Sequence, residues 1–307
     1  MRLRDLTLIA VAALLAAPAS AGASQLITRN ATHPHLIVDR HGRALVSYRK
    51  SHRAQHVLAW GAINARPPSR SRKQVEFRLD YAGGYGHFHR AYWKTMRNSC
   101  RPYHPRLHWL VTACTARDGS HWALQEWRRL MPNGGYTRFH GEQGKRELQL
   151  SHWSGPLPRL WLKTDWVKVR TASGAKEVDH LFGQLSYRGR PVHGFRNTRQ
   201  GNPLDGYGRN IYLDTLNSPW GRGWRRLNSF LTHDPHGNFC AFAGRLWGHR
   251  TFGMGSAYRA GAMGPGVTPV VFWQGAAPGR YDESLDARRN AENKRLAGSP
   301  RDHCWSR

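Results

Sequence analysis

The chain has 307 residues, of which 47 are lysine or arginine and only 19 are aspartate or glutamate, giving a formal net charge of +28 at pH 7. This length supports one large β-domain or two small domains with a substantial hydrophobic core. The basic residues are spread along the whole sequence, which excludes a neutral body with a separate basic tail. A charge of this size opposes compaction by self-repulsion and attracts polyanions.

Arginine far outnumbers lysine. Its planar guanidinium can grip a phosphate or carboxylate with two parallel hydrogen bonds, which favours an anionic ligand. A GC-rich coding sequence also raises arginine over lysine, but it does not explain the shortage of acids.

Residues 1–23 have the pattern of a secretory signal peptide. Arg2 and Arg4 precede an apolar run over 6–17, and Pro18 comes before small-residue cleavage sites at 19–21 and 21–23. The run is shorter than the roughly 20 residues that span a bilayer, although a retained anchor is the alternative. We therefore expect residues 24–307 to be an exported β-rich protein, secreted or associated with the cell envelope, with no transmembrane segment after cleavage.

The first elements of the exported part are predicted to be strands. Residues 35–39 and 44–48 predict a hairpin around a turn that contains Gly42, and 57–63 predicts a third strand. Residues 75–81 alternate cleanly, with the apolar side chains on one face. A short helix is predicted near 90–99.

The middle of the chain continues this pattern. Residues 107–116 and 121–130 predict a hairpin around the Asp118-Gly119 turn, although 122–127 also fits a helix. Residues 148–153 and 160–169 predict paired strands around a Gly/Pro turn. Further strands are predicted at 180–187, 190–195, 210–215, 227–232, 239–243 and 267–274.

One helix near the C-terminus is well marked. Asp282 can cap residues 282–296, and Lys294 and Arg295 lie near the end, which suits the helix dipole. With so many short strands and Gly/Pro turns, the chain is predicted to be mainly β, as an antiparallel β-sandwich or distorted barrel with this surface helix. A soft domain boundary is predicted near 132–146.

The cysteine count also fits export. Four cysteines in an exported chain predict two disulfides, for which three pairings exist. We favour Cys100 with Cys114, and Cys240 with Cys304. The first bridge closes a short loop and contributes about 3 kcal/mol, and the second ties the C-terminal segment to the body.

The histidines do not define a metal site. His33 and His35, and His87 and His89, form two His-x-His pairs that would share a face on an extended strand. Neither pair has a third ligand at a recognisable spacing. We predict no metal and no cofactor, and a histidine-rich metal-binding protein is the third hypothesis.

Candidate catalytic residues are few. His233 and Asp234 could form a base with its orienting carboxylate, but Asp234 to Gly237 is also typical of a turn. A glycan hydrolase needs two carboxylates about 5–10 Å apart. Asp205 and Asp214, which flank a Gly-Tyr-Gly-Arg segment, are the first pair to test. The other acids on or beside predicted strands are Glu126, Glu147, Asp165 and Asp179.

Aromatic residues beside basic ones are the strongest ligand signal. The chain has 13 tryptophans, and the segment 217–226 holds Trp220, Arg222, Trp224, Arg225 and Arg226 among glycines. Aromatic faces stack on sugar rings or bases while arginine holds nearby anionic groups. The glycines predict an exposed loop here. The core of the sandwich is predicted to take Trp60, Trp109, Trp161 and Trp273.

These features favour a non-enzymatic protein that binds an anionic polymer of the cell envelope or the extracellular matrix. Teichoic-type phosphates, acidic polysaccharides and nucleic acid are the polymers considered, with counterion release dominating affinity. The alternative is a hydrolase that acts on an acidic polysaccharide, for which a pair of facing carboxylates is the discriminating feature.

Overall fold

The computed structural model describes residues 23–66, 71–129, 144–171, 174–192, 196–197, 203–204, 212–219, 221–229, 231–233, 238–242, 254–264 and 267–297. The predicted signal peptide lies outside these ranges except for Ala23. Within them, no helix combines the length and the apolar character that a membrane crossing requires.

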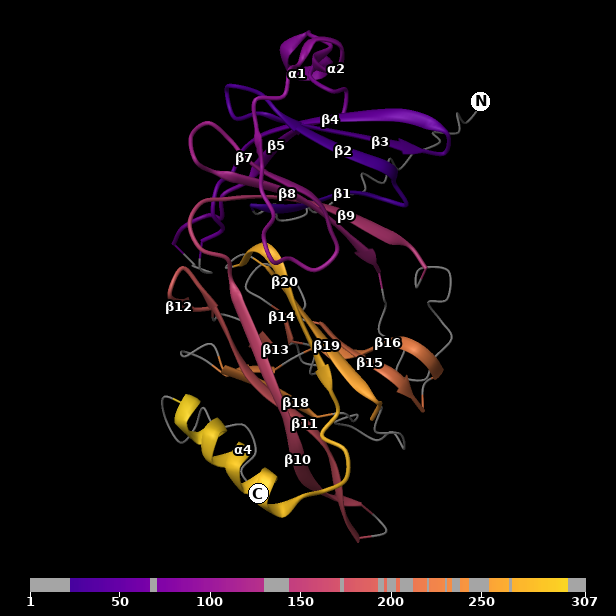
Figure 1. Cartoon of the computed structure of the whole chain (residues 1–307), viewed down its shortest axis with the longest axis vertical. Coiled ribbons are helices and arrows are strands. Elements are labelled where there is room, and N and C mark those ends of the chain that lie inside the picture. The colour runs from indigo at the N-terminus through magenta and orange to yellow at the C-terminus, as the bar shows by residue number, and fades with distance from the viewer. Residues whose placement is uncertain are drawn as a thin grey trace, which may run out of the picture.

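The chain forms two antiparallel sandwiches that follow one another along the long axis of the molecule (Figure 1). In the N-terminal sandwich, one sheet has the order β1-β9-β8-β7-β6 and the other β2-β3-β4-β5. The strands are β1 (Ser24–Arg29), β2 (Thr32–Val38), β3 (Ala44–Lys50), β4 (Arg53–Gly61), β5 (Phe77–Asp80), β6 (Arg101–Pro102), β7 (Leu110–Thr115), β8 (His121–Arg128) and β9 (Arg146–Trp153). Two one-turn helices, α1 (Tyr85–Phe88) and α2 (Tyr92–Thr95), follow β5.

The C-terminal sandwich has one sheet of order β10-β11-β18-β17, with β12 beside β11, and a second of order β16-β15-β19-β20. Its strands are β10 (Arg159–Thr171), β11 (Gly174–Tyr187), β12 (Arg190–Pro191), β15 (Tyr212–Ser218), β16 (Gly221–Ser229), β17 (Leu231–His233), β18 (Asn238–Phe242), β19 (Ala257–Gly264) and β20 (Val267–Ala276). A separate two-stranded sheet pairs β13 (Arg196–Asn197) with β14 (Pro203–Leu204). The prediction of a mainly β, antiparallel fold is confirmed, and the described sheets do not close into a barrel.

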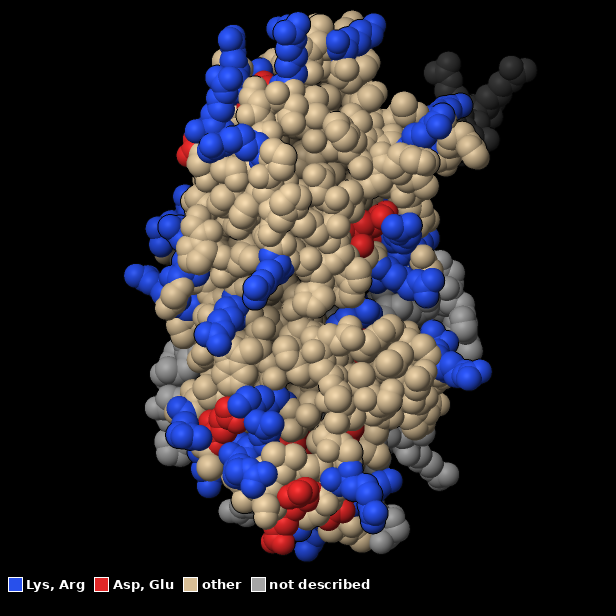
Figure 2. Space-filling view, viewed as in Figure 1, with Lys and Arg blue, Asp and Glu red and all other residues tan. Residues whose placement is uncertain are grey.

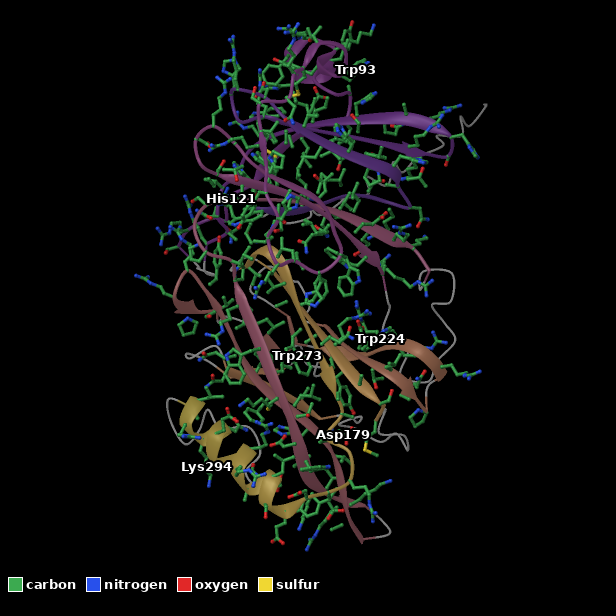
Figure 3. The ribbon with its side chains drawn as sticks, viewed as in Figure 1. Trp93, His121, Asp179, Trp224, Trp273 and Lys294 are labelled. Atoms are coloured by element: carbon green, nitrogen blue, oxygen red, sulfur yellow. A yellow bond between two sulfur atoms is a disulfide. The ribbon has the colours of Figure 1, made fainter. Side chains whose placement is uncertain are left out.

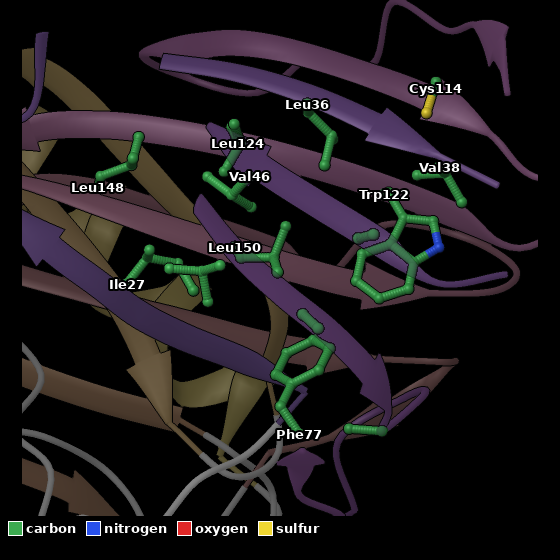
Figure 4. Packing of buried hydrophobic residues seen from close by; sticks show 14 of the residues in the cluster. Ile27, Leu36, Val38, Val46, Phe77, Cys114, Trp122, Leu124, Leu148 and Leu150 are labelled. Atoms are coloured by element: carbon green, nitrogen blue, oxygen red, sulfur yellow. The ribbon is translucent and has the colours of Figure 1, made fainter. Parts of the chain in front are cut away.

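Each sandwich has its own core. In the N-terminal one, Trp122, Leu124, Leu148 and Leu150 from one sheet pack against apolar side chains of the other, such as Val46 (Figure 4). In the C-terminal one, residues of β10, β11 and β18 pack against β15, β19 and β20. The predicted core tryptophans Trp60, Trp109, Trp161 and Trp273 are only partly buried. Among the described tryptophans, those with 5% exposure or less are Trp122, Trp127, Trp153 and Trp166.

Strand β20 joins the two sandwiches. Val270 and Phe272 pack with Trp127 of β8, and the side-chain amide of Gln125 donates to the Val270 carbonyl at 3.1 Å. The Ala65 N–H donates to Thr268 Oγ1 at 3.2 Å. The predicted boundary near 132–146 stays a prediction, since 130–143 lie outside the described residues, and 146–153 pair within the N-terminal sandwich.

The hairpins predicted from local patterns are confirmed, including β2–β3 and β7–β8, and residues 122–127 are strand, not helix. The predicted pairing of 148–153 with 160–169 is wrong. β9 pairs with β1 and β8, while the 13-residue β10 pairs along its whole length with β11 in a long hairpin. The long β10–β11 hairpin forms more backbone hydrogen bonds than a pairing of 148–153 with 160–169 could form. The helix predicted near 90–99 is reduced to the single turn of α2, because the chain is extended again at Met96.

The disulfide between Cys100 and Cys114 is confirmed; it ties the start of β6 to β7 at a Cα–Cα distance of 5.6 Å. Cys240 of β18 is also disulfide-bonded. Its predicted partner, Cys304, lies outside the described residues.

The predicted C-terminal helix is confirmed as α4 (Glu283–Leu296), with the Asp282 carboxylate accepting from the Leu285 N–H at 2.8 Å. The helix lies along β10 and β11 (Figure 1), where Glu292 pairs with Lys163 and Leu296 packs on Phe182 and Cys240.

The underside of α4 is polar. Atoms of Asp286, Arg289 and Asn290 are buried without a hydrogen-bond partner among the described residues, as are Asp165 Oδ2 and His180 Nε2. Burial and the Asp165 carboxylate raise the pKa of Asp286. A carboxyl with a raised folded pKa weakens docking of the helix as pH rises from the ordinary value of about 3.9 through the folded value.

We therefore expect Asp286→Asn to raise the melting temperature by about 2 °C near pH 7, because it removes a charge held in the interface. The gain should shrink toward zero as pH falls to about 3.9. Thermal melts at several pH values measure this, with Glu283→Gln, an exposed acid on the same helix, as control. A destabilised Asp286→Asn variant at pH 7 contradicts the argument.

Candidate functional site

A groove of about 920 Å³ lies where the two sandwiches meet. Its walls come from the segment after β4 and the segment before β5 on one side, and from the β11–β12 hairpin on the other. Four arginines line it, together with one acid, Glu76, the single carboxylate among its described lining residues. The arginines are Arg66, Arg72, Arg188 and Arg190.

Asn64 lines the groove and hydrogen-bonds to residues on both sides of it. Its side chain bonds Ser154 twice, donating to Ser154 Oγ at 2.7 Å and accepting from the Ser154 N–H at 2.9 Å. Its Oδ1 also accepts from the Tyr187 hydroxyl at 3.0 Å, which links the N-terminal sandwich to β11. Burial raises the pKa of Tyr187 to about 12, so the hydroxyl stays a neutral donor at physiological pH.

The β11–β12 turn presents two of the arginines. Arg188 and Gly189 both have positive φ, 52° and 71°, the backbone of a type I′ hairpin turn. Tyr187 and Arg190 pair across this turn. Since Tyr187 is anchored at Asn64, the turn fixes Arg188 and Arg190 over the groove, and both are exposed.

On the other wall, Arg66 is exposed and donates to the Lys73 carbonyl at 3.2 Å. This acceptor is neutral, so the bond leaves the positive charge of the guanidinium in place. Ile63 is 40% exposed and adds an apolar surface to the groove.

His152 supports this wall from behind. It is buried, stacks on Trp122 at 3.8 Å, and its Nδ1 lies 2.6 Å from the Ala62 carbonyl. Its Nε2 lies 2.9 Å from Ser120 Oγ, which donates to Asp118 at 2.6 Å. Burial lowers the pKa of His152 to about 4, so the ring is neutral at pH 7, with Nδ1 donating to the Ala62 carbonyl.

The predicted cluster at 217–226 has a different structure from the one expected. Residues 221–226 belong to strand β16, so the prediction of a glycine loop is wrong there: pairing with β15 satisfies the backbone. Trp224 lies on the β15–β16 side of the C-terminal sandwich (Figure 3), and Arg222 is exposed. Trp220 lies outside the described residues.

Two arginines at this cluster, Arg226 and Arg259, form ion pairs with the same acid, Asp214. Asp214 is buried and accepts from Arg226 Nε at 2.8 Å and Arg259 Nη2 at 2.9 Å. Arg259 lies between the Trp224 and Trp109 rings, at 4.4 and 4.8 Å from their centroids. Arg226 is therefore an internal counter-charge. Arg222 and Arg225 remain predicted ligand-binding residues.

The predicted catalytic residues are not brought together within the described part of the chain. Asp205 and Asp234 lie outside it, and of His233 only the backbone, at the end of β17, is described. The other candidate carboxylates each bond a partner: Glu126 with Arg146, Glu147 with Arg29, Asp165 with His180, and Asp179 with Tyr258. Sequence reasoning missed the groove arginines, because only the fold brings them together.

The histidine pairs do not form a metal site either. His87 is in α1 and His89 is its left-handed C-cap, so they do not share a strand face. His33 lies at a bulge in β2. The described residues contain no group of three His, Cys, Asp or Glu side chains that could hold a metal ion.

Comparison with protein-family models, with curated proteins and with solved structures finds no match to this chain.

The neutral state of His152 predicts a pH-dependent stability. The unfolded histidine binds a proton below about pH 6.5 and the folded one resists until about pH 4, so stability is lost as pH falls across this window, by roughly 3 kcal/mol. We expect His152→Gln to flatten this slope and to lower stability at pH 7.

Urea unfolding at pH 7, 5.5 and 4.5 measures the difference between the two proteins. Burial also lowers the pKa of His121, so the difference, and not the wild-type slope, isolates His152. Equal slopes for wild type and His152→Gln contradict the prediction.

Proposed function

We propose that this chain is an exported protein that binds anionic polymers, and that the arginine groove between the sandwiches is where the polymer is held. The observation that carries the proposal is the gathering of Arg66, Arg72, Arg188 and Arg190 around one open groove with a single acid among its described lining residues. Guanidinium groups match phosphate and carboxylate geometry, and their planar fork loses less side-chain entropy per hydrogen bond formed.

The rest of the surface supports encounter with such a polymer. Lys and Arg side chains are distributed over the face in view instead of gathering in one patch (Figure 2). A charge spread in this way draws a polyanion from many directions, while a defined groove supplies the register. Binding should therefore combine a salt-sensitive background with a tighter component at the groove.

The proposal of a hydrolase for an acidic polysaccharide has less support. Such an enzyme needs two carboxylates about 5–10 Å apart across the scissile bond. The described lining of the groove contributes Glu76 alone, and the neighbouring cleft adds only Asp118, which accepts from Ser120. The exported location agrees with the disulfide between Cys100 and Cys114.

The binding proposal predicts the effect of removing groove arginines. We expect Arg188→Gln with Arg190→Gln to weaken binding of polyphosphate and polygalacturonate about tenfold at 0.1 M salt, and to lower the slope of log affinity against log salt by about 2. Titrations of the oxidised protein between 0.05 and 0.3 M salt measure both quantities.

The matched control is Arg49→Gln with Arg53→Gln, which removes the same charge from exposed positions at the opposite end of β4 from Gly61. We expect this variant to stay within about twofold of wild type, since its residues contribute only to the diffuse field. Equal losses in both variants contradict a groove and indicate generic charge attraction.

The packing of Ala23 predicts where a leader is removed. Ala23 is fully buried, its carbonyl accepts from the His152 N–H at 2.9 Å, and the next residue, Ser24, is also buried. Cleavage after Ala23 would put a charged amino group there, whereas cleavage after Ala21 leaves this packing intact. We expect the intact mass of the secreted protein to match a chain that begins at Gly22. A mass that matches a chain beginning at Ser24 contradicts this prediction.

A further inference from the structure

A second cleft, of about 700 Å³, continues from the arginine groove. The two share Gly61 and Ile63, so a chain that lies in the groove reaches the cleft without leaving the surface. The cleft lies between α1, β4 and the β2–β3 and β7–β8 turns. Its lining includes Arg43, Trp60, Arg78, His87, Phe88 and Asp118.

One wall of the cleft is aromatic. The Trp60 ring lies 4.9 Å from His87 and 5.1 Å from Phe88, at interplanar angles of 38° and 55°. His87 and Phe88 meet edge to face at 4.6 Å. Because the rings are tilted toward one another, they make a curved apolar surface and not a flat stacking platform.

A buried carboxylate holds this wall in position. Asp80 of β5 accepts from the Ala82 and His87 N–H groups, each at 2.8 Å, and so fixes α1 against the sheet. A Cβ at Gly86 would lie only 3.0 Å from Asp80 Oδ1, so the close approach of the helix favours glycine there. The aromatic wall is therefore formed before any ligand arrives.

The cleft also contains side chains of both charges. Arg78 is exposed and pairs with Trp60 across β4 and β5, and Arg43 is fixed by Asp39 at 2.6 Å and by the Tyr92 hydroxyl at 2.6 Å. Hydrogen bonds from Ser120 lower the pKa of Asp118, which keeps its carboxylate ionised. The cleft thus offers both a cation for an acidic group and an acceptor for hydroxyl groups.

We propose that this aromatic cleft is a sugar-binding subsite, which makes the polymer of the proposed function an acidic polysaccharide. The inference depends on that proposed function, since the groove holds the chain. The tilted wall suits the puckered, C–H-rich face of a pyranose ring, Arg78 suits its carboxylate or sulfate, and Asp118 suits its hydroxyls. A nucleic acid fits less well, because its flat bases need a flat stacking face, which this tilted wall does not offer.

The test compares three polyanions at 0.1 M salt: polygalacturonate, which has sugar rings; polyphosphate, which has none; and oligothymidylate, which has bases. We expect the wild-type protein to bind polygalacturonate about tenfold more tightly than polyphosphate at matched charge, given the usual size of aromatic stacking contributions. We expect Trp60→Leu and His87→Ala each to remove most of this preference and to leave polyphosphate affinity unchanged.

Trp93→Leu is the matched control. Trp93 is a 37% exposed tryptophan of α2 that stacks on His56 at 5.4 Å, outside the cleft, so its loss should leave the preference intact. His87 is exposed, so His87→Ala keeps the test valid even where Trp60→Leu reduces folding. Circular dichroism verifies the fold of each variant.

Equal affinity of the wild type for polygalacturonate and polyphosphate overturns the sugar subsite while the arginine groove stands. Tighter binding of oligothymidylate than of polygalacturonate overturns it in favour of a nucleic acid. If the protein binds none of the three polyanions, the proposed function and the subsite are both overturned.

Discussion

The hydrogen bonds of the Asn64 side chain position the arginine groove between the two sandwiches. The side chain bonds Ser154, where the chain leaves the first sandwich, and Tyr187, at the end of a strand of the second. One amide therefore sets the position of both groove walls. An amide with several hydrogen-bond partners is intolerant of substitution, because each lost bond leaves a polar group without its partner.

Several of the described acids lie inside the fold and bond its own groups. Asp214 holds Arg226 and Arg259, Asp39 holds Arg43, and Asp80 orders α1. Buried charges of this kind are stable only when paired or hydrogen-bonded. The acids consequently determine which basic groups belong to the architecture and which, such as Arg188 and Arg190, face solvent with their charge available.

Local patterns in the sequence were sufficient for elements whose partners are neighbours. The β2–β3 hairpin, the Asp118-Gly119 turn and the Asp282 cap follow from residues a few positions apart. The partner of β9 could not be found in this way, because pairing with β1 spans most of the N-terminal sandwich. The groove was missed for the same reason: Arg66 and Arg188 meet only through the packing of β20 and the Asn64–Tyr187 bond.

The two walls of the groove belong to different sandwiches, and this has a thermodynamic consequence. A ligand that contacts both walls binds only the assembled arrangement, so its free energy of binding is added to the cohesion between the sandwiches. Ligand binding and the association of the two sandwiches are therefore thermodynamically linked. A ligand bound across both walls stiffens the junction between the sandwiches. A substitution that weakens this junction lowers the affinity for the ligand even when all four groove arginines are present.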